Sequence, residues 1–151
     1  MTTPPVTFRE ATAADVPAIV ALLAEDLLGA QRENAEPEVY ARAFEAILAQ
    51  PGNRVYVGES GGEIVACYQL TIISNLSLMA SDRAQLEAVR VASKMRGQKV
   101  GQALMEDVDR RARAAGAALV QFTSNNARKD AHRFYERLGY APSHVGFKKT
   151  F

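Results

Sequence analysis

The chain is poor in the residues that bind metals and form disulfides. Its 151 residues include one cysteine, Cys67, and two histidines. A single cysteine excludes an internal disulfide framework and fits a reducing compartment. So few thiols and imidazoles also argue against a structural zinc site, and we expect no bound metal. Cys67 lies in the apolar run 64–70, where we expect a small buried side chain rather than a nucleophile.

Long apolar runs are absent as well. No stretch is long enough to span a bilayer, and the opening MTTPP is a polar lead-in rather than a basic and apolar leader. We therefore expect a cytoplasmic protein with no membrane partner. With 48% hydrophobic and 23% charged residues, the chain can bury one core, and we expect a single domain over residues 1–151.

The net charge is only +1, but the charges are unevenly distributed. Residues 1–82 contain 4 Lys/Arg and 11 Asp/Glu, whereas residues 83–151 contain 14 and 6. The basic half suits a polyanionic cofactor, and the acidic half favours a cationic second substrate. The alternative is two solvated faces without a partner. We expect no nucleic-acid partner, because the basic residues are interleaved with acids and not with aromatic residues.

The spacing of apolar residues predicts alternating strands and helices. Strands are predicted at residues 6–10, 54–59, 63–73, 85–91, 118–123 and 145–149. Helices are predicted from Thr12 or Asp15 to about Leu27, at 38–49, from within 96–101 to Gly116, and at 127–138, with loops at 29–37 and 74–83. The strand 118–123 has the apolar composition of a buried strand in a mixed sheet. This order predicts an α/β fold.

A glycine-bearing turn joins the strand 86–91 to the next helix. Backbone N–H groups at a helix start have no partner inside the helix and lie at the positive end of its dipole. With the added charge of Arg96 and Lys99, a phosphate or pyrophosphate is the natural ligand. A purely structural joint is the alternative. The turn consists of Arg96, Gly97, Gln98, Lys99, Val100 and Gly101.

A second motif, AHRFYERLGY at residues 131–140, is typical of a short helix closed by a glycine. The two motifs together resemble the GNAT superfamily of acyl-CoA-dependent N-acyltransferases. That family's phosphate loop reads Arg/Gln-x-x-Gly-x-Gly/Ala, and its late helix reads Ala-x-x-Phe/Leu-Tyr-Glu-x-Leu-Gly-Phe/Tyr. The opening FREATAAD at residues 8–15 also resembles the family's first strand and helix start. The resemblance covers nearly the whole chain and implies a central mixed sheet with helices on both faces.

The resemblance implies direct acetyl transfer from acetyl-CoA to a primary amine, without a covalent acyl-enzyme. It implies contacts to the pantetheine arm from Val91, with Val89 beside it, where the strands 86–91 and 119–123 splay apart. Residues 96–101 would contact the pyrophosphate. Asn126 stands where the cofactor arm is often held, and the alternative is an N-cap of the helix 127–138.

Tyr135 matches the family's general acid. A phenol is protonated at neutral pH and can donate to the departing thiolate of coenzyme A. The alternative for Tyr135 is a core aromatic beside Phe134. The family's phosphate loop usually has Gly at its fourth position, where this chain has Lys99. A positive φ there would cost about 1–2 kcal/mol, so we expect helical φ and ψ at Lys99, with its ammonium assisting phosphate binding.

Glu87 is the candidate general base. An alternating strand places Glu87 on the face of Val89 and Val91, and the opposite facing of Arg90 argues against an ion pair between Glu87 and Arg90. A structural ion pair of Glu87 with another residue is the alternative. A lysine-like amine needs such a base, because its deprotonation at pH 7 costs roughly 4–5 kcal/mol.

We expect the acceptor to be a small-molecule amine. Two alternatives remain open: protein or peptide N-acetylation across the loops 29–37 and 74–83, and a non-catalytic acyl-CoA-binding regulatory module. A homodimer is also left open.

Overall fold

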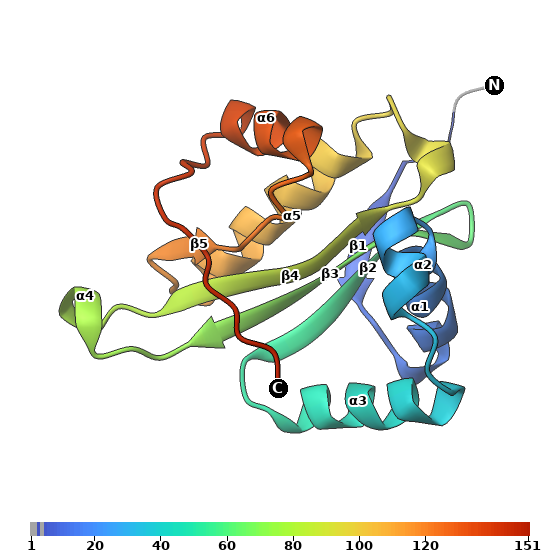
Figure 1. Ribbon diagram of the computed structural model, residues 1–151, viewed down its shortest axis with the longest axis horizontal. Coiled ribbons are helices and arrows are strands. Elements are labelled where there is room, and N and C mark those ends of the chain that lie inside the picture. The colour runs from blue at the N-terminus through green and yellow to red at the C-terminus, as the bar shows by residue number, and fades with distance from the viewer. Residues whose placement is uncertain (1–2, 4) are drawn as a thin grey trace. The chain divides into compact units, whose positions relative to one another are not determined.

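One five-stranded sheet organises the chain (Figure 1). The computed structural model describes residues 3 and 5–151, so the polar lead-in lies partly outside the described residues. The chain divides into two units that meet in sequence between Gln121 and Phe122, and each is described by itself. The single domain expected over 1–151 stays a prediction.

The sheet runs in the order β1-β2-β3-β4-β5. The first four strands pair antiparallel, and β5 pairs parallel to β4 after a helical crossover. The expected mixed sheet is therefore confirmed. Its strands are β1 (Thr7–Glu10), β2 (Asn53–Ser60), β3 (Glu63–Ile73), β4 (Arg83–Val91) and β5 (Leu119–Gln121).

Helices cover both faces of this sheet, as expected (Figure 1). One face packs against α5 (Val100–Ala114), whose Asp107 accepts a hydrogen bond from Tyr68 on β3. The other faces α1 (Val16–Ala24), α2 (Leu27–Arg32) and α3 (Pro37–Ala49). Two short 3-10 turns, η1 (Ala13–Asp15) and η2 (Ser93–Met95), precede α1 and the turn before α5. We call the two sides the α5 face and the α1 face.

The α5 face carries fully buried apolar side chains from both the sheet and the helix. Leu70 and Leu86 are cross-strand partners there, and Leu104 and Val108 of α5 are fully buried. Burying each such side chain contributes about 1.5–3 kcal/mol to folding. The buried apolar residues of α5 recur every four residues, and they position the helix and with it the turn at its start.

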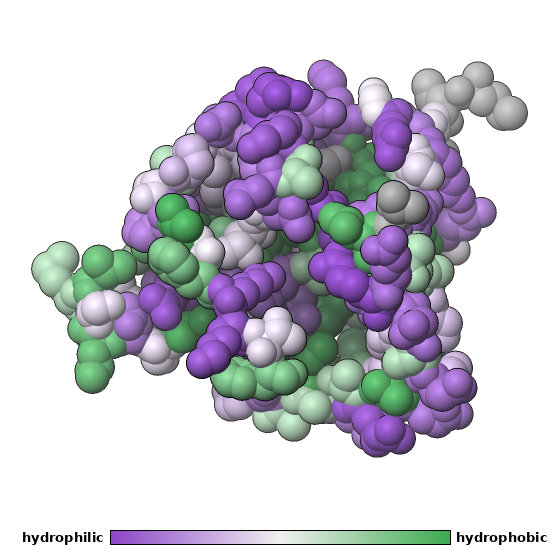
Figure 2. Space-filling view, viewed as in Figure 1, coloured by the Kyte–Doolittle hydropathy of each residue, from purple (hydrophilic) through white to green (hydrophobic). Residues whose placement is uncertain are grey.

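Two expected loops contain structure. The segment 29–37 begins inside α2, whose N-cap Asp26 accepts a hydrogen bond from the Gly29 amide at 2.6 Å. The segment 74–83 contains the turn α4 (Ser77–Ala80), where Leu78, Met79 and Ala80 have positive φ. Large apolar side chains, including Leu78 and Met79, are exposed around this turn, and Figure 2 shows an apolar tip there.

Strand β5 is shorter and more exposed than expected. It spans three residues rather than 118–123, and Leu119 and Gln121 are exposed. The prediction of a buried strand over 118–123 is wrong, because apolar composition does not supply the neighbours that bury a strand.

The second unit contains the helix α6 (Lys129–Arg137). Gly139 follows it with φ +93°, and the Tyr140 amide donates to the Tyr135 carbonyl at 3.1 Å, so the predicted glycine cap is confirmed. The expected strand at 145–149 is wrong, since residues 141–151 carry no strand. An alternating pattern forms a strand only where another strand completes the hydrogen-bond ladder. Within the described chain, no helix is long and apolar enough to cross a membrane.

Candidate active site

The turn before α5 is left-handed at two positions. Gly97 has φ +75° and Lys99 has φ 60°, ψ 20°. The expectation of helical φ and ψ at Lys99 is therefore wrong. A side chain in this conformation costs about 1–2 kcal/mol. Both residues lie between η2 and α5, and backbone strain such as that at Lys99 concentrates at ligand sites.

Backbone N–H groups of this turn have unused donor capacity. Within the described part of the chain, five amides from the turn and the first turn of α5 donate to no protein acceptor, whereas the next amide, that of Ala103, donates to the Lys99 carbonyl. Such a series at the start of a 15-residue helix suits an anion. The five are those of Gly97, Lys99, Val100, Gly101 and Gln102.

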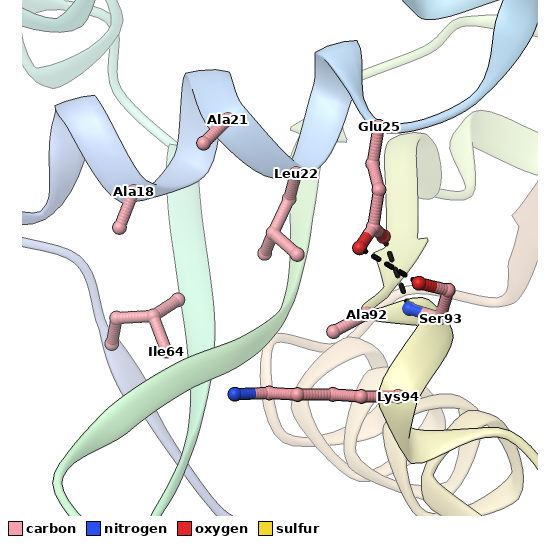
Figure 3. Close-up of a pocket in the computed structure, with 8 residues that line it drawn as sticks. All are labelled: Ala18, Ala21, Leu22, Glu25, Ile64, Ala92, Ser93 and Lys94. Atoms are coloured by element: carbon pink, nitrogen blue, oxygen red, sulfur yellow. Dashed lines mark hydrogen bonds between the residues drawn. The ribbon is translucent and has the colours of Figure 1, made fainter.

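A surface pocket of about 460 Å³ lies just before the turn (Figure 3). Glu25 reaches into it from the end of α1, and its carboxylate accepts from the Ser93 amide at 3.1 Å and the Ser93 hydroxyl at 3.0 Å. Lys94 forms an ion pair with Glu63. The Ser93 amide therefore already donates to a protein carboxylate and is not open to a ligand. The pocket is lined by Ala18, Ala21, Leu22, Glu25, Ile64, Ala92, Ser93 and Lys94.

Strands β4 and β5 part after three residue pairs. Arg83, Ala84 and Gln85 pair with β5, but β4 continues to Val91 without a partner on that side among the strands described. The open edge leaves main-chain groups along residues 86–91 for an extended ligand. Val89 and Val91 lie on this edge, where the family resemblance implies the pantetheine arm.

A β-bulge interrupts β4 at Ala88, which has φ +55°. Gln69 pairs with Glu87 and Cys67 with Arg90, so three steps along β4 match two steps along β3. The extra residue shifts the alternation by one. Glu87 and Arg90 therefore share the α1 face.

Val91 pairs with Ala66 and lies on the opposite face from Glu87. The prediction that Glu87 shares the face of Val91 is wrong, and so is the opposite facing of Glu87 and Arg90. Alternation holds only for an uninterrupted strand, and Ala88 gives no sequence signal for a bulge that glycine usually marks.

Glu87 is exposed, and its side chain forms no hydrogen bond or ion pair with any described residue. Polar side chains that the sequence analysis missed lie around it on the α1 face. They form a row of direct cross-strand neighbours. The sequence signal for this row is the period-two spacing of polar residues, Gln69 with Thr71 on β3 and Gln85 with Glu87 on β4. The row consists of Asn53, Thr71, Gln85 and Gln121, with Gln69 opposite Glu87.

In the second unit, the ring of Tyr135 lies in an aromatic cluster. Its centroid is 4.5 Å from that of Phe122, 5.3 Å from Phe134 and 6.3 Å from Tyr140. These contacts fix the ring, as both the general-acid role and the core role require. The acid role of Tyr135 stays a prediction.

Asn126 is exposed in the loop before α6. The N-cap alternative for it is wrong, because α6 begins at Lys129 with Arg128 as its N-cap. The side chain that organises this loop is Asn125, whose Oδ1 accepts from the Ala127 amide at 2.9 Å. The contact of Asn126 with the cofactor arm stays a prediction.

Metal-binding side chains do not gather in the described residues, which contain no group of three or more His, Cys, Asp or Glu arranged to hold an ion.

Comparison with known proteins gives consistent results. The model of the Acetyltransferase (GNAT) family matches residues 19–140. The aminoalkylphosphonate N-acetyltransferase of Salmonella typhimurium is 33% identical over 142 residues, which is 94% of this chain and 89% of that protein.

Two solved structures are similar over nearly their full lengths. One, described as a transcriptional regulator from Bacillus halodurans, is 42% identical with a TM-score of 0.93 and covers 97% of this chain and 100% of its own. The other, a putative acetyltransferase from Agrobacterium tumefaciens, is 26% identical with a TM-score of 0.86 and covers 96% and 99%.

Proposed function

The chain belongs to the GNAT family of acetyltransferases and transfers acetyl groups from acetyl-CoA to an amine, and we propose that Glu87 and Tyr135 move the protons of this reaction. The acceptor is a small-molecule primary amine, a class to which the substrate named for the Salmonella relative belongs. The observation that carries the proposal is the open edge of β4. It leads to the start of α5, where five backbone amides donate to no acceptor in the part of the chain that the structure describes.

In the reaction, the amine nitrogen attacks the thioester carbonyl of acetyl-CoA. A C–N bond forms, the C–S bond breaks, and coenzyme A leaves as a thiolate. One proton leaves the amine and one proton reaches the thiolate. We assign the first to Glu87, whose carboxylate oxygens are unused by the described protein, and the second to the phenol of Tyr135.

The co-substrate would be held by the turn and the β4 edge. The amides of Gly97, Lys99, Val100 and Gly101 and the charge of Arg96 suit its pyrophosphate. The Gln98 amide is already used, since it donates to the Met95 carbonyl at 3.3 Å, and its side-chain Nε2 donates to the Lys94 carbonyl at 3.2 Å, so Gln98 would contribute through the remaining N–H of its side chain. The main chain at Val89 and Val91 would pair with the pantetheine arm, and Asn126 would hold the arm from the loop before α6.

The burial of Cys67 supports direct transfer of the acetyl group without a covalent acyl-enzyme. Cys67 is 1% exposed, and burial raises the pKa of its thiol to about 12. A thiol that stays protonated at neutral pH is a poor nucleophile. The expectation of a small buried side chain at this position is confirmed.

The test is release of free thiol from acetyl-CoA in the presence of a panel of small primary amines, measured with a thiol-reactive dye. We expect release that depends on the amine, together with the N-acetylated product by mass spectrometry. Binding of acetyl-CoA without release, for every amine in the panel, would instead indicate the regulatory module, and release only with peptides would indicate peptide acetylation. The cytoplasmic location and the homodimer stay predictions.

A further inference from the structure

The bulge at Ala88 brings a carboxylate and a guanidinium to one side of β4. Glu87 and Arg90 face the α1 side, opposite Gln69 and Cys67 of β3. Two residues of an extended strand span about 7 Å, so the two side chains start about that far apart. They do not form an ion pair with each other in the structure.

Arg90 has donors that the protein leaves unfilled. Its side chain is 19% exposed. Nη1 donates to the Val89 carbonyl at 2.8 Å. Nε forms an ion pair with Asp26 Oδ2 at 3.9 Å, but it is buried and has no hydrogen-bond partner among the described residues. The other Asp26 oxygen accepts from the Gly29 amide at the start of α2. A largely buried guanidinium in this state is costly unless another group completes its hydrogen bonds.

Gln69 is oriented by a buried partner. Its Nε2 donates to Asn53 Oδ1 at 2.9 Å, and Thr71 Oγ1 donates to the same oxygen at 3.1 Å. Asn53 is 5% exposed and its own amide donates to Gln50 at 2.7 Å, so its orientation is fixed. The Gln69 carbonyl oxygen is therefore left as an acceptor beside its cross-strand neighbour Glu87.

We propose that the acetyl acceptor carries an acid group as well as its amine, and that side chains on the α1 face bind both groups. Glu87 and the Gln69 carbonyl accept from the amine, and the Arg90 guanidinium binds the acid group at the other end of a short alkyl chain. A guanidinium suits either a phosphonate or a carboxylate, since both offer paired oxygens to its fork. This inference rests on the proposed function, and the phosphonate substrate named for the Salmonella relative agrees with it.

The test compares three primary amines of similar length under saturating acetyl-CoA: 2-aminoethylphosphonate, β-alanine and propylamine. We expect kcat/KM for at least one of the two acidic amines to exceed that for propylamine by about 10-fold to 100-fold, the range of a charge-assisted pair. The preferred acidic amine then shows which acid group the site takes.

Variants assign the residues. In Arg90→Met the ratio of kcat/KM for the acidic amine to kcat/KM for propylamine should fall to near unity. The fall should come from a higher KM for the acidic amine, with kcat/KM for propylamine unchanged. Arg83→Met is the matched control, because Arg83 also lies on the α1 face with a buried, unpartnered Nε but pairs with β5 away from Glu87. Gln69→Met should raise KM for all three amines and leave the acetyl-CoA Kd unchanged.

Three results would overturn the inference or its premise. Equal kcat/KM for propylamine and both acidic amines in the parent would remove the acid-group site while leaving acetyl transfer intact. A preference retained in Arg90→Met, or in Arg90→Lys if the methionine variant does not fold, would remove Arg90 from it. Thiol release with none of the amines in the wider panel would instead refute the proposed function itself.

Discussion

The two faces of the central sheet differ in how completely their charged side chains are hydrogen-bonded within the protein. On the α5 face, the fully buried Tyr68 donates to Asp107 at 2.5 Å, and Arg111 donates to the same carboxylate oxygen at 2.8 Å. Arg111 also donates to the Phe8 carbonyl and stacks over Tyr56 at 4.2 Å. On the α1 face, Glu87 and Arg90 leave oxygens and donors unused.

The difference separates stability from function. Buried polar groups that satisfy one another hold α5 against the sheet, and they offer nothing to a ligand. Groups with unused capacity contribute little to folding and are available for binding. Substitutions on the α5 face should therefore change the free energy of unfolding, and those on the α1 face and the turn should change kinetics and affinity.

The largest effect is expected for Asp107→Ala. Removing this carboxylate leaves the Tyr68 hydroxyl and the Arg111 guanidinium without their shared acceptor, and breaking a buried ion pair costs about 3–5 kcal/mol. Urea denaturation measures this loss. Gln85→Leu, on the α1 face, is the control and should change stability by no more than about 0.5 kcal/mol. Equal losses in the free energy of unfolding for the two variants would contradict the proposed difference between the α5 face and the α1 face.

Tyr135, in the second unit, tests the proton transfer to the leaving thiolate. Tyr135→Phe should lower kcat about 100-fold, the usual size of general-acid catalysis, while the acetyl-CoA Kd stays unchanged. Tyr140→Phe is the matched control, because Tyr140 contacts the same Phe122 ring at 5.0 Å. Near-normal turnover of Tyr135→Phe would assign Tyr135 to the aromatic core.

The turn should behave like the α1 face. Gly101→Val places a β-branched side chain beside the open amides, and we expect acetyl-CoA affinity to fall about 10-fold with stability nearly unchanged. Calorimetric titration measures the affinity. Ala114→Val, at the exposed far end of α5, controls for the effect of a β-branched residue on the helix. Unchanged affinity in Gly101→Val would argue against anion binding by this turn.

The sequence was sufficient to predict the parts of the fold that depend on residue patterns within a single element. The apolar stripe of α5, the hairpin of β2 and β3 and the glycine cap after α6 follow from spacing and turn chemistry within one element. The face of Glu87 could not be predicted, because the bulge at Ala88 depends on how β4 pairs with Tyr68 and its neighbours. The prediction of helical φ and ψ at Lys99 failed for a related reason, since the chain path between η2 and α5 overrides the backbone preference of a single residue.

A smaller effect is expected from the ion pair between the exposed Arg9 and the buried Asp15. Arg9 donates to both Asp15 oxygens, at 2.7 and 3.0 Å, and the Thr12 amide donates at 2.7 Å. The Arg9 hydrogen bonds lower the pKa of Asp15 to about 2. A depressed carboxyl pKa stabilises the fold above the unfolded-state pKa of about 3.9, and this stabilisation is lost as pH falls through about 2.

Asp15→Asn should therefore be less stable than the parent at neutral pH, and the difference should shrink between about pH 4 and pH 2. Thermal melts across this range measure it. A difference that stays constant with pH would show that the pair does not carry the effect.

The smallest effect is expected for Lys99→Gly, which removes strain at a position with open donors. Glycine adopts φ 60° without the cost of about 1–2 kcal/mol that a side chain incurs, but it also loses about 0.5–1 kcal/mol through greater freedom in the unfolded chain. The net gain should be about 0.5–1 kcal/mol in the free energy of unfolding, measured by urea denaturation. If the Lys99 ammonium contributes to pyrophosphate binding, the same variant binds acetyl-CoA more weakly, with a difference that disappears at high salt because screening removes the charge contribution. Gly97→Ala is the opposing control, since a Cβ there meets no atom within 4 Å but acquires the strain of φ +75°, so it should lose stability. A Lys99→Gly variant that is less stable than the parent would show that the lysine side chain makes a compensating contact, and that the turn, like the α5 face, is held by its own side chains.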